Sequence, residues 1–207
     1  MPATRSGAAA LRVVLVGALL TVLGACSTTQ MSRMNAPEPV VDIHRSTMAV
    51  EEAHAKRARG ERVWCVPFAR TMSGIEIRGN AETWWSGAKG IYERGHDPEV
   101  GAVMVFSGTR KLPMGHVAVV SEIVSDREIR IDHANWKRNQ VSLGMAVIDV
   151  SEKGDWSAVK VAYDPGKYGR VYPISGFIYP QPLPGAMMAG AETAEDATVV
   201  VSTSGAL

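Results

Sequence analysis

The feature that most constrains the fold is a series of short apolar segments in the second half of the chain. They are rich in Val, Ile and aromatic residues and are separated by Gly, Pro or charged residues. Segments of this length and composition are typical of β-strands. We expect strands at residues 102–106, 117–124, 128–133, 146–150, 159–163 and 176–179. Consecutive short strands of this kind predict an antiparallel sheet.

Two helices are expected before the strands. The first spans residues 65–73, because Pro67 suits a first helical turn, Cys65, Phe68 and Met72 share one face, and Gly74 follows as a stop. The second is expected from Asn80 as its cap to a stop at Gly95. Its expected buried face consists of Trp84, Trp85, Ala88, Ile91 and Tyr92. Helices followed by an antiparallel sheet define an α+β domain, with the N-terminal helices packed on the sheet.

The two ends of the chain differ from this central part. Residues 1–25 contain arginines followed by an apolar run that is too short to cross a bilayer, as in a signal peptide. The sequence Leu23-Gly24-Ala25-Cys26 resembles a bacterial lipobox, so we expect Cys26 to be lipidated; a plain signal peptide is the alternative. Residues 26–59 are expected to form a tether with a peripheral helix, residues 60–181 the domain, and residues 182–207 a disordered tail.

Charge and cysteine content exclude several classes of protein. The formal net charge is +1, and removal of residues 1–25 would make it about −1, so no basic surface for nucleic acid is expected. The chain has two cysteines, and with Cys26 acylated Cys65 would be a lone thiol in an oxidising compartment. The histidines lack zinc-site spacing, and we expect neither a metal nor a cofactor.

Cys65 has candidate partners later in the chain. A cysteine at a helix N-terminus has a favoured thiolate, because unpaired N–H groups point toward it. His116 enters one predicted strand, and His133 and Asn135 share a face of the next, whereas Asp132 points to the other face. Cys65, His116 and Asn135 therefore follow the chain order of a papain-like Cys-His-Asn arrangement.

Several motifs together resemble the CHAP domain, a family of cysteine- and histidine-dependent amidohydrolases and peptidases. They lie between residues 64 and 136 and occur in the family's order. The matching stretches are Cys65-Val66-Pro67-Phe68-Ala69, Asn80-Ala81 with Trp84, Pro98 with Gly101, Gly115-His116-Val117-Ala118, and His133-Ala134-Asn135-Trp136. The resemblance implies a papain-like fold and cleavage of amide bonds in peptidoglycan, by N-acetylmuramoyl-L-alanine amidase or peptide endopeptidase chemistry.

The resemblance also implies roles for individual residues. Cys65 would be the nucleophile, His116 the general base and then acid, and Asn135 the residue that orients His116. Many members have an acidic residue where this chain has His133, so either His133 or Asn135 would be the orienting residue. Trp64 stands where the family often has glutamine, which removes a possible side-chain donor to the oxyanion.

These features predict a lipid-anchored enzyme of the cell envelope, on the periplasmic face of the outer membrane if the cell is Gram-negative. Its expected partners are a peptidoglycan peptide or muropeptide as substrate, the membrane through its N-terminal lipid, and an envelope activator protein. One alternative is a catalytically silent CHAP-like lipoprotein that binds wall peptides or an envelope partner. Another is hydrolysis of an amide bond in a different small substrate.

Overall fold

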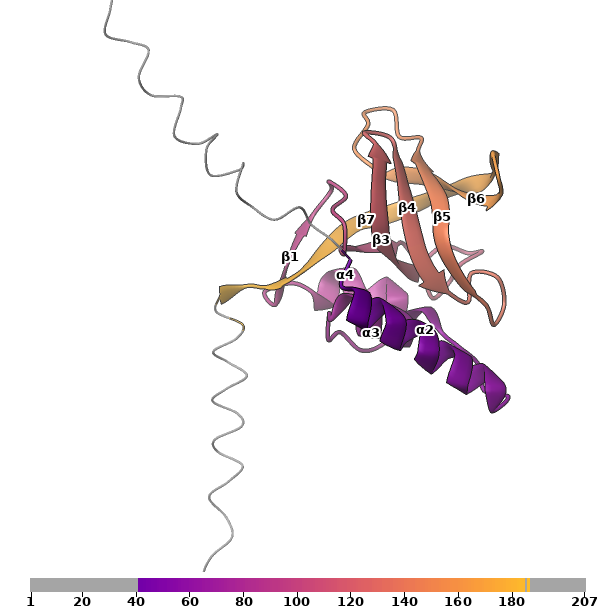
Figure 1. Cartoon of the computed structure of the whole chain (residues 1–207). Coiled ribbons are helices and arrows are strands. Elements are labelled where there is room, and N and C mark those ends of the chain that lie inside the picture. Colours follow the sequence, from indigo (N-terminus) through magenta and orange to yellow (C-terminus); the bar gives the residue numbers. More distant parts are fainter. Residues whose placement is uncertain (1–40, 185, 187–207) are drawn as a thin grey trace, which may run out of the picture. The chain divides into compact units, whose positions relative to one another are not determined.

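The computed structural model describes residues 41–184 and 186, which form helices followed by a sheet (Figure 1). The helical elements are α2 (Ile43–Ala58), α3 (Cys65–Ser73), the short 3-10 helix η1 (Ala81–Thr83) and α4 (Trp84–Gly87). The strands are β1 (Tyr92–Gly95), β2 (Val103–Phe106), β3 (His116–Ser125), β4 (Glu128–Ala134), β5 (Val141–Asp149), β6 (Ala158–Asp164) and β7 (Lys167–Pro182). The predicted α+β class and each predicted strand are confirmed, most strands being longer than expected.

The sheet closes on itself, which the prediction of an antiparallel sheet with N-terminal helices packed on it did not include. Its seven strands follow the order β1-β7-β2-β3-β4-β5-β6, and β6 pairs in addition with β7. The first part of β7 pairs with β6, from Lys167 to Pro173, and the part after it pairs with β2, from Ile174 to Ile178. Strands β2 to β7 therefore form a closed antiparallel barrel, and β1 extends it beside the end of β7.

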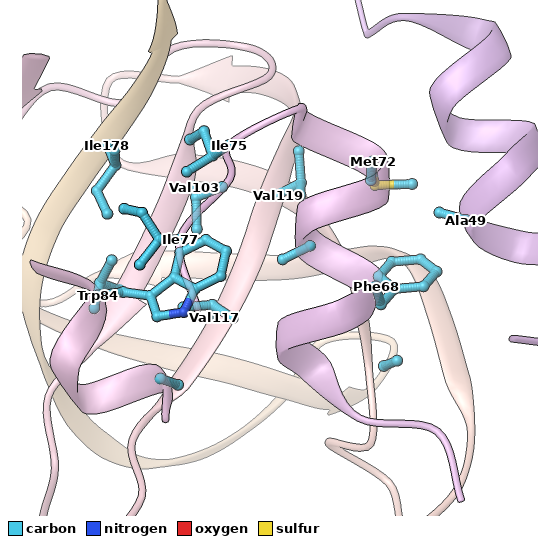
Figure 2. Packing of buried hydrophobic residues seen from close by; sticks show 14 of the residues in the cluster. Ala49, Phe68, Met72, Ile75, Ile77, Trp84, Val103, Val117, Val119 and Ile178 are labelled. Carbon is cyan, nitrogen blue, oxygen red and sulfur yellow. The ribbon is translucent and has the colours of Figure 1, made fainter. Parts of the chain in front are cut away.

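Alternation along the strands produces two separate hydrophobic clusters. One lies between the helices and the outer face of the barrel, and Figure 2 shows Phe68 and Met72 on the side of α3 toward Ala49 of α2, with Val119 on the other side of α3. The other fills the barrel and includes Met104, Phe106, Ile131 and Phe177. We call them the helix cluster and the barrel cluster. Neighbouring residues of one strand belong to different clusters, because successive side chains point to opposite faces.

Helix α3 has the predicted bounds. It ends where Gly74 takes a left-handed conformation with φ of 76°, which a residue without Cβ adopts at no steric cost. Helix α2 lies beside it (Figure 1) and buries Ala49 and Ala53 in the helix cluster. Asp42 caps α2, since its carboxylate accepts a hydrogen bond from the backbone N–H of His44 at 2.9 Å.

The second predicted helix is wrong beyond its first turns. Helix α4 ends at Gly87, and Gly90 takes a φ of 78°, so the chain turns and continues as β1. Tyr92 is buried in that strand and its hydroxyl accepts from the backbone N–H of Glu76, whereas Ile91 is 45% exposed. Asn80 makes no capping hydrogen bond through its side chain. The apolar spacing favoured a helix, but the two glycines weaken it.

The lipidation, signal-peptide and tail predictions lie mainly outside the described residues, because Cys26 and residues 187–207 are not among them. Among the helices of residues 41–184, none is long and apolar enough to cross a membrane.

Candidate active site

Cys65 is the first residue of α3, and its side chain meets the start of strand β3. The thiol is free and the residue is partly buried. Burial raises the pKa of the Cys65 thiol, while the backbone N–H groups of Val117, Val66 and Cys65 itself act in the opposite direction. The Val117 amide can face the sulfur because β3 and β4 begin to pair only at Val119. The sulfur therefore faces the backbone of Val117, the residue that follows His116 in β3.

His116 is the first residue of β3 and is held by a second histidine. Its Nε2 atom lies 3.0 Å from Nδ1 of His133, which follows Ile129 and Ile131 on the inner face of β4. His116 is 4% exposed and His133 is completely buried. Because Nε2 of His116 is committed to His133, only its Nδ1 atom remains available to exchange a proton with Cys65.

Aromatic side chains enclose the two imidazole rings. The ring of Trp136 meets that of His116 edge to face, with centroids 4.9 Å apart, and stacks on His133 at 5.6 Å. Phe106, which is opposite His116 in the β2–β3 register, lies 5.6 Å from the His116 ring. Tyr172 of β7 packs against both Phe106 and Trp136. The histidine pair thus lies in an apolar environment at one end of the barrel cluster.

This environment keeps both histidines neutral. Burial lowers the pKa of His116 well below its usual value, and the positive charge that His133 can carry lowers it further. Burial also lowers the pKa of His133 to about 3. With the pKa of Cys65 raised, the resting site contains a neutral thiol and two neutral imidazoles near pH 7. Burial of Cys65 thus opposes the thiolate that its position at the start of α3 favours.

Asn135 points elsewhere. Its side-chain oxygen accepts a hydrogen bond from the backbone N–H of Asn139 at 2.9 Å, and its own backbone N–H donates to Gln140 at 2.7 Å. Among the hydrogen bonds of residues 41–184, none joins Asn135 to His116. The structure therefore brings His133, and not Asn135, to the ring of His116. Asp132 lies on the opposite face of β4, as predicted, and accepts from Ser121 and Gly144.

Sequence reasoning missed two residues near this site. Trp136 was named only as the end of a family motif, although its ring packs against both histidines. Asn139 was not considered, yet its side chain accepts a hydrogen bond from the backbone N–H of Val63, two residues before Cys65. A second asparagine four residues after Asn135 was the available signal, because asparagine tolerates left-handed backbone in loops.

Other features of the described residues do not belong to this site. Arg110 and Lys111 are exposed in the loop before β3, and no group of three or more potential metal ligands occurs in the described part of the chain. An open hollow of about 580 Å³ lies over β4, β5 and the β6–β7 hairpin, with Arg130, Lys137 and Tyr163 in its lining. Neither Cys65 nor His116 lines it.

Comparison with known proteins identifies one family. The model of the CHAP domain matches residues 57–135, a range that contains Cys65, His116, His133 and Asn135. No curated protein matches the chain. CHAP domains are generally amidase or peptidase hydrolase domains that act in peptidoglycan hydrolysis, and their fold is papain-like. The match over residues 57–135 supports the resemblance of this part of the chain to the CHAP domain family.

Proposed function

We propose that this protein is a cell-envelope cysteine hydrolase that cleaves amide bonds in peptidoglycan, as an N-acetylmuramoyl-L-alanine amidase or a peptide endopeptidase. The observation that carries the proposal is the hydrogen bond of 3.0 Å between His116 and His133, beside a thiol at the start of α3. A nucleophile, a base and a residue that orients the base are the three groups that acyl transfer to a thiol needs.

In the first half of the reaction, Nδ1 of His116 takes the proton of the Cys65 thiol while the sulfur attacks the amide carbon. The oxyanion that forms accepts a hydrogen bond from the backbone N–H of Cys65. As the C–N bond breaks, His116 returns the proton to the leaving nitrogen, so an amine departs and a thioester remains on Cys65. His116 then takes a proton from water while the water oxygen attacks the thioester carbon. The C–S bond breaks, His116 returns the proton to the sulfur of Cys65, and a carboxylic acid leaves.

His133 is the orienting residue in this proposal. For Nδ1 of His116 to accept a proton, its Nε2 must carry hydrogen and donate it to Nδ1 of His133. His133 then carries its own hydrogen on Nε2, a buried atom without a hydrogen-bond partner in the described residues. A neutral imidazole fixes the tautomer and the ring plane, but it does not offset the charge of an imidazolium as a carboxylate would.

The proposal includes the N-terminal segment. Lipid on Cys26 would hold the domain at a membrane of the envelope, on the periplasmic face of the outer membrane in a Gram-negative cell. The substrate would then be a peptidoglycan peptide or a muropeptide within reach of that anchor, and an envelope protein could serve as activator. The sequence Leu23-Gly24-Ala25-Cys26 supports this part of the proposal.

Digestion of purified peptidoglycan under reducing conditions, followed by mass analysis of the products, tests the proposal. We expect new muropeptides from the wild-type protein and none from Cys65→Ala, with both proteins folded by circular dichroism. The masses identify the bond, because an amidase releases free stem peptide and an endopeptidase shortens it. Binding to sacculi without cleavage, and equal for both proteins, would instead support the catalytically silent alternative.

A further inference from the structure

Two asparagines connect the loop after β4 to the segment before the nucleophile. The side-chain oxygen of Asn135 accepts from the backbone N–H of Asn139 at 2.9 Å. The side-chain oxygen of Asn139 in turn accepts from the backbone N–H of Val63, also at 2.9 Å. Val63 is 2% exposed and lies in the helix cluster, so the second bond ends on backbone that is itself fixed by packing.

The backbone of this loop restricts what can occupy both positions. Asn135 has a φ of 64° and Asn139 a φ of 58°, in the left-handed region that residues with a Cβ rarely adopt. Asparagine and aspartate tolerate this region better than other side chains, and glycine adopts it freely. Only asparagine or aspartate combines this tolerance with a short side-chain oxygen that accepts a hydrogen bond. The positions therefore need both properties.

The same loop touches both halves of the site. Trp136 follows Asn135 directly and packs on the rings of His116 and His133. At its other end, Asn139 binds the backbone two residues before Cys65. A backbone hydrogen bond of 2.7 Å between Asn135 and Gln140 closes the loop. We therefore expect the residues of the loop to move together. The base and the nucleophile are thereby held by one short piece of chain.

We propose that Asn139 is a positioning residue of the reaction, which sets the distance between the thiol of Cys65 and the ring of His116. This inference rests on the proposed function, and it assigns the asparagines a task different from orienting the imidazole. Without the bond to Val63, the start of α3 would be held to the barrel only by side-chain packing and by the contact of Cys65 with the Val117 amide, so its position would be less closely fixed. Misplacement of reacting groups by about 1 Å costs on the order of 100-fold in rate.

Three substitutions at one position test the proposal. Asn139→Asp keeps the acceptor and the tolerance of positive φ, Asn139→Gly keeps only the backbone freedom, and Asn139→Ala loses both. We expect Asn139→Asp to retain most of the wild-type activity. We expect Asn139→Gly to lower kcat by about 10- to 100-fold, with KM nearly unchanged. Asn80→Ala is the matched control, because the side chain of this asparagine makes no capping hydrogen bond.

The rate of Cys65 alkylation by iodoacetamide, measured against pH, gives a second readout that needs no wall substrate. We expect Asn139→Gly to lose the assistance of His116, so that its rate falls and its pH profile moves toward that of an isolated thiol. If Asn139→Gly melts at a lower temperature but keeps the wild-type kcat and alkylation profile, its role is structural and the inference fails. Slower alkylation in a protein that cleaves no peptidoglycan would support the inference while refuting the proposed function.

Discussion

The helix cluster and the barrel cluster each hold one reacting group. Cys65 packs at the edge of the helix cluster, whereas His116 and His133 lie against Phe106 and Trp136 of the barrel cluster. The barrel is closed by backbone hydrogen bonds, but α3 is joined to it by side-chain packing and by the loop that contains Asn139. The base thus belongs to the barrel, which is the more constrained part of the molecule. The distance between the base and the thiol depends on how α3 is positioned on the barrel.

Removing the imidazole of His116 should have the largest effect on the rate of hydrolysis. His116→Ala deletes the proposed base, and general-base catalysis contributes roughly 100- to 10,000-fold to a rate. We expect a loss of this size in the rate of muropeptide release, with the protein still folded. His96→Ala, at an exposed histidine, is the control and should leave the rate unchanged. Equal activity of His116→Ala and wild type would remove His116 from the mechanism.

A pair of core substitutions separates the two clusters. Met72 lies in the helix cluster and Met104 in the barrel cluster, and both are buried. Each change to Ala should lower the free energy of unfolding by about 2–5 kcal/mol. At a temperature well below the unfolding transitions of both variants, we expect Met72→Ala to slow the alkylation of Cys65 more than Met104→Ala does. The opposite ranking would mean that the barrel, not α3, determines the position of the thiol.

The two faces of β4 provide a smaller effect with an internal control. His133→Leu removes the acceptor for His116, and we expect the rate of hydrolysis to fall by about 10- to 100-fold through misorientation of the imidazole. His133→Asn places an amide oxygen near the position of Nδ1 and should restore part of that rate. Asp132→Asn, on the opposite face, should not change the rate. If all three variants were equally active, His133 would not orient the base.

Counted per pH unit, the smallest effect is the dependence of stability on pH. Both buried histidines have pKa values below the unfolded value of about 6.5. As the pH falls below 6.5, the unfolded chain therefore binds protons that the folded chain does not, and stability decreases. Each histidine contributes a slope of up to about 1.4 kcal/mol per pH unit. For His133 this window extends down to its pKa of about 3.

Urea unfolding at several pH values between 4 and 7 measures this slope. Because His133→Asn cannot be protonated there, its unfolding free energy should fall less steeply with acid than that of the wild type. Parallel curves would show that His133 titrates alike in the folded and unfolded chain.

Elements whose ends are marked by residues nearby in the sequence were predicted well. The bounds of α3 followed from Pro67 near its start and Gly74 at its end, which are features of the chain itself. Closure of the barrel was missed because it depends on β7, of which only residues 176–179 were recognised as a strand. The part of β7 that pairs with β6 is mostly exposed and contains Gly169 and Pro173, so it lacks the apolar pattern of a strand.

The site was predicted in part for the same reason. Cys65 and His116 were placed correctly at a helix end and a strand start, because alternation and helix stops are local. Strand alternation predicted that His133 and Asn135 share one face of the strand. That prediction requires the strand to continue to Asn135. Strand β4 ends at Ala134, and the positive φ of Asn135 turns its side chain into the loop. Neither sequence spacing nor family resemblance could reveal that turn.

Closure of the barrel also affects how the protein meets other protein chains. An open sheet leaves two rows of unpaired backbone groups, to which strands of other molecules can add and so begin aggregation. Here the pairing of β6 with β7 removes the edge that β6 would present, and β1 remains at the end of the sheet. That strand has four residues, includes Glu93 and Arg94, and has an irregular register with β7. A short, charged and irregular edge is a poor template for strand addition.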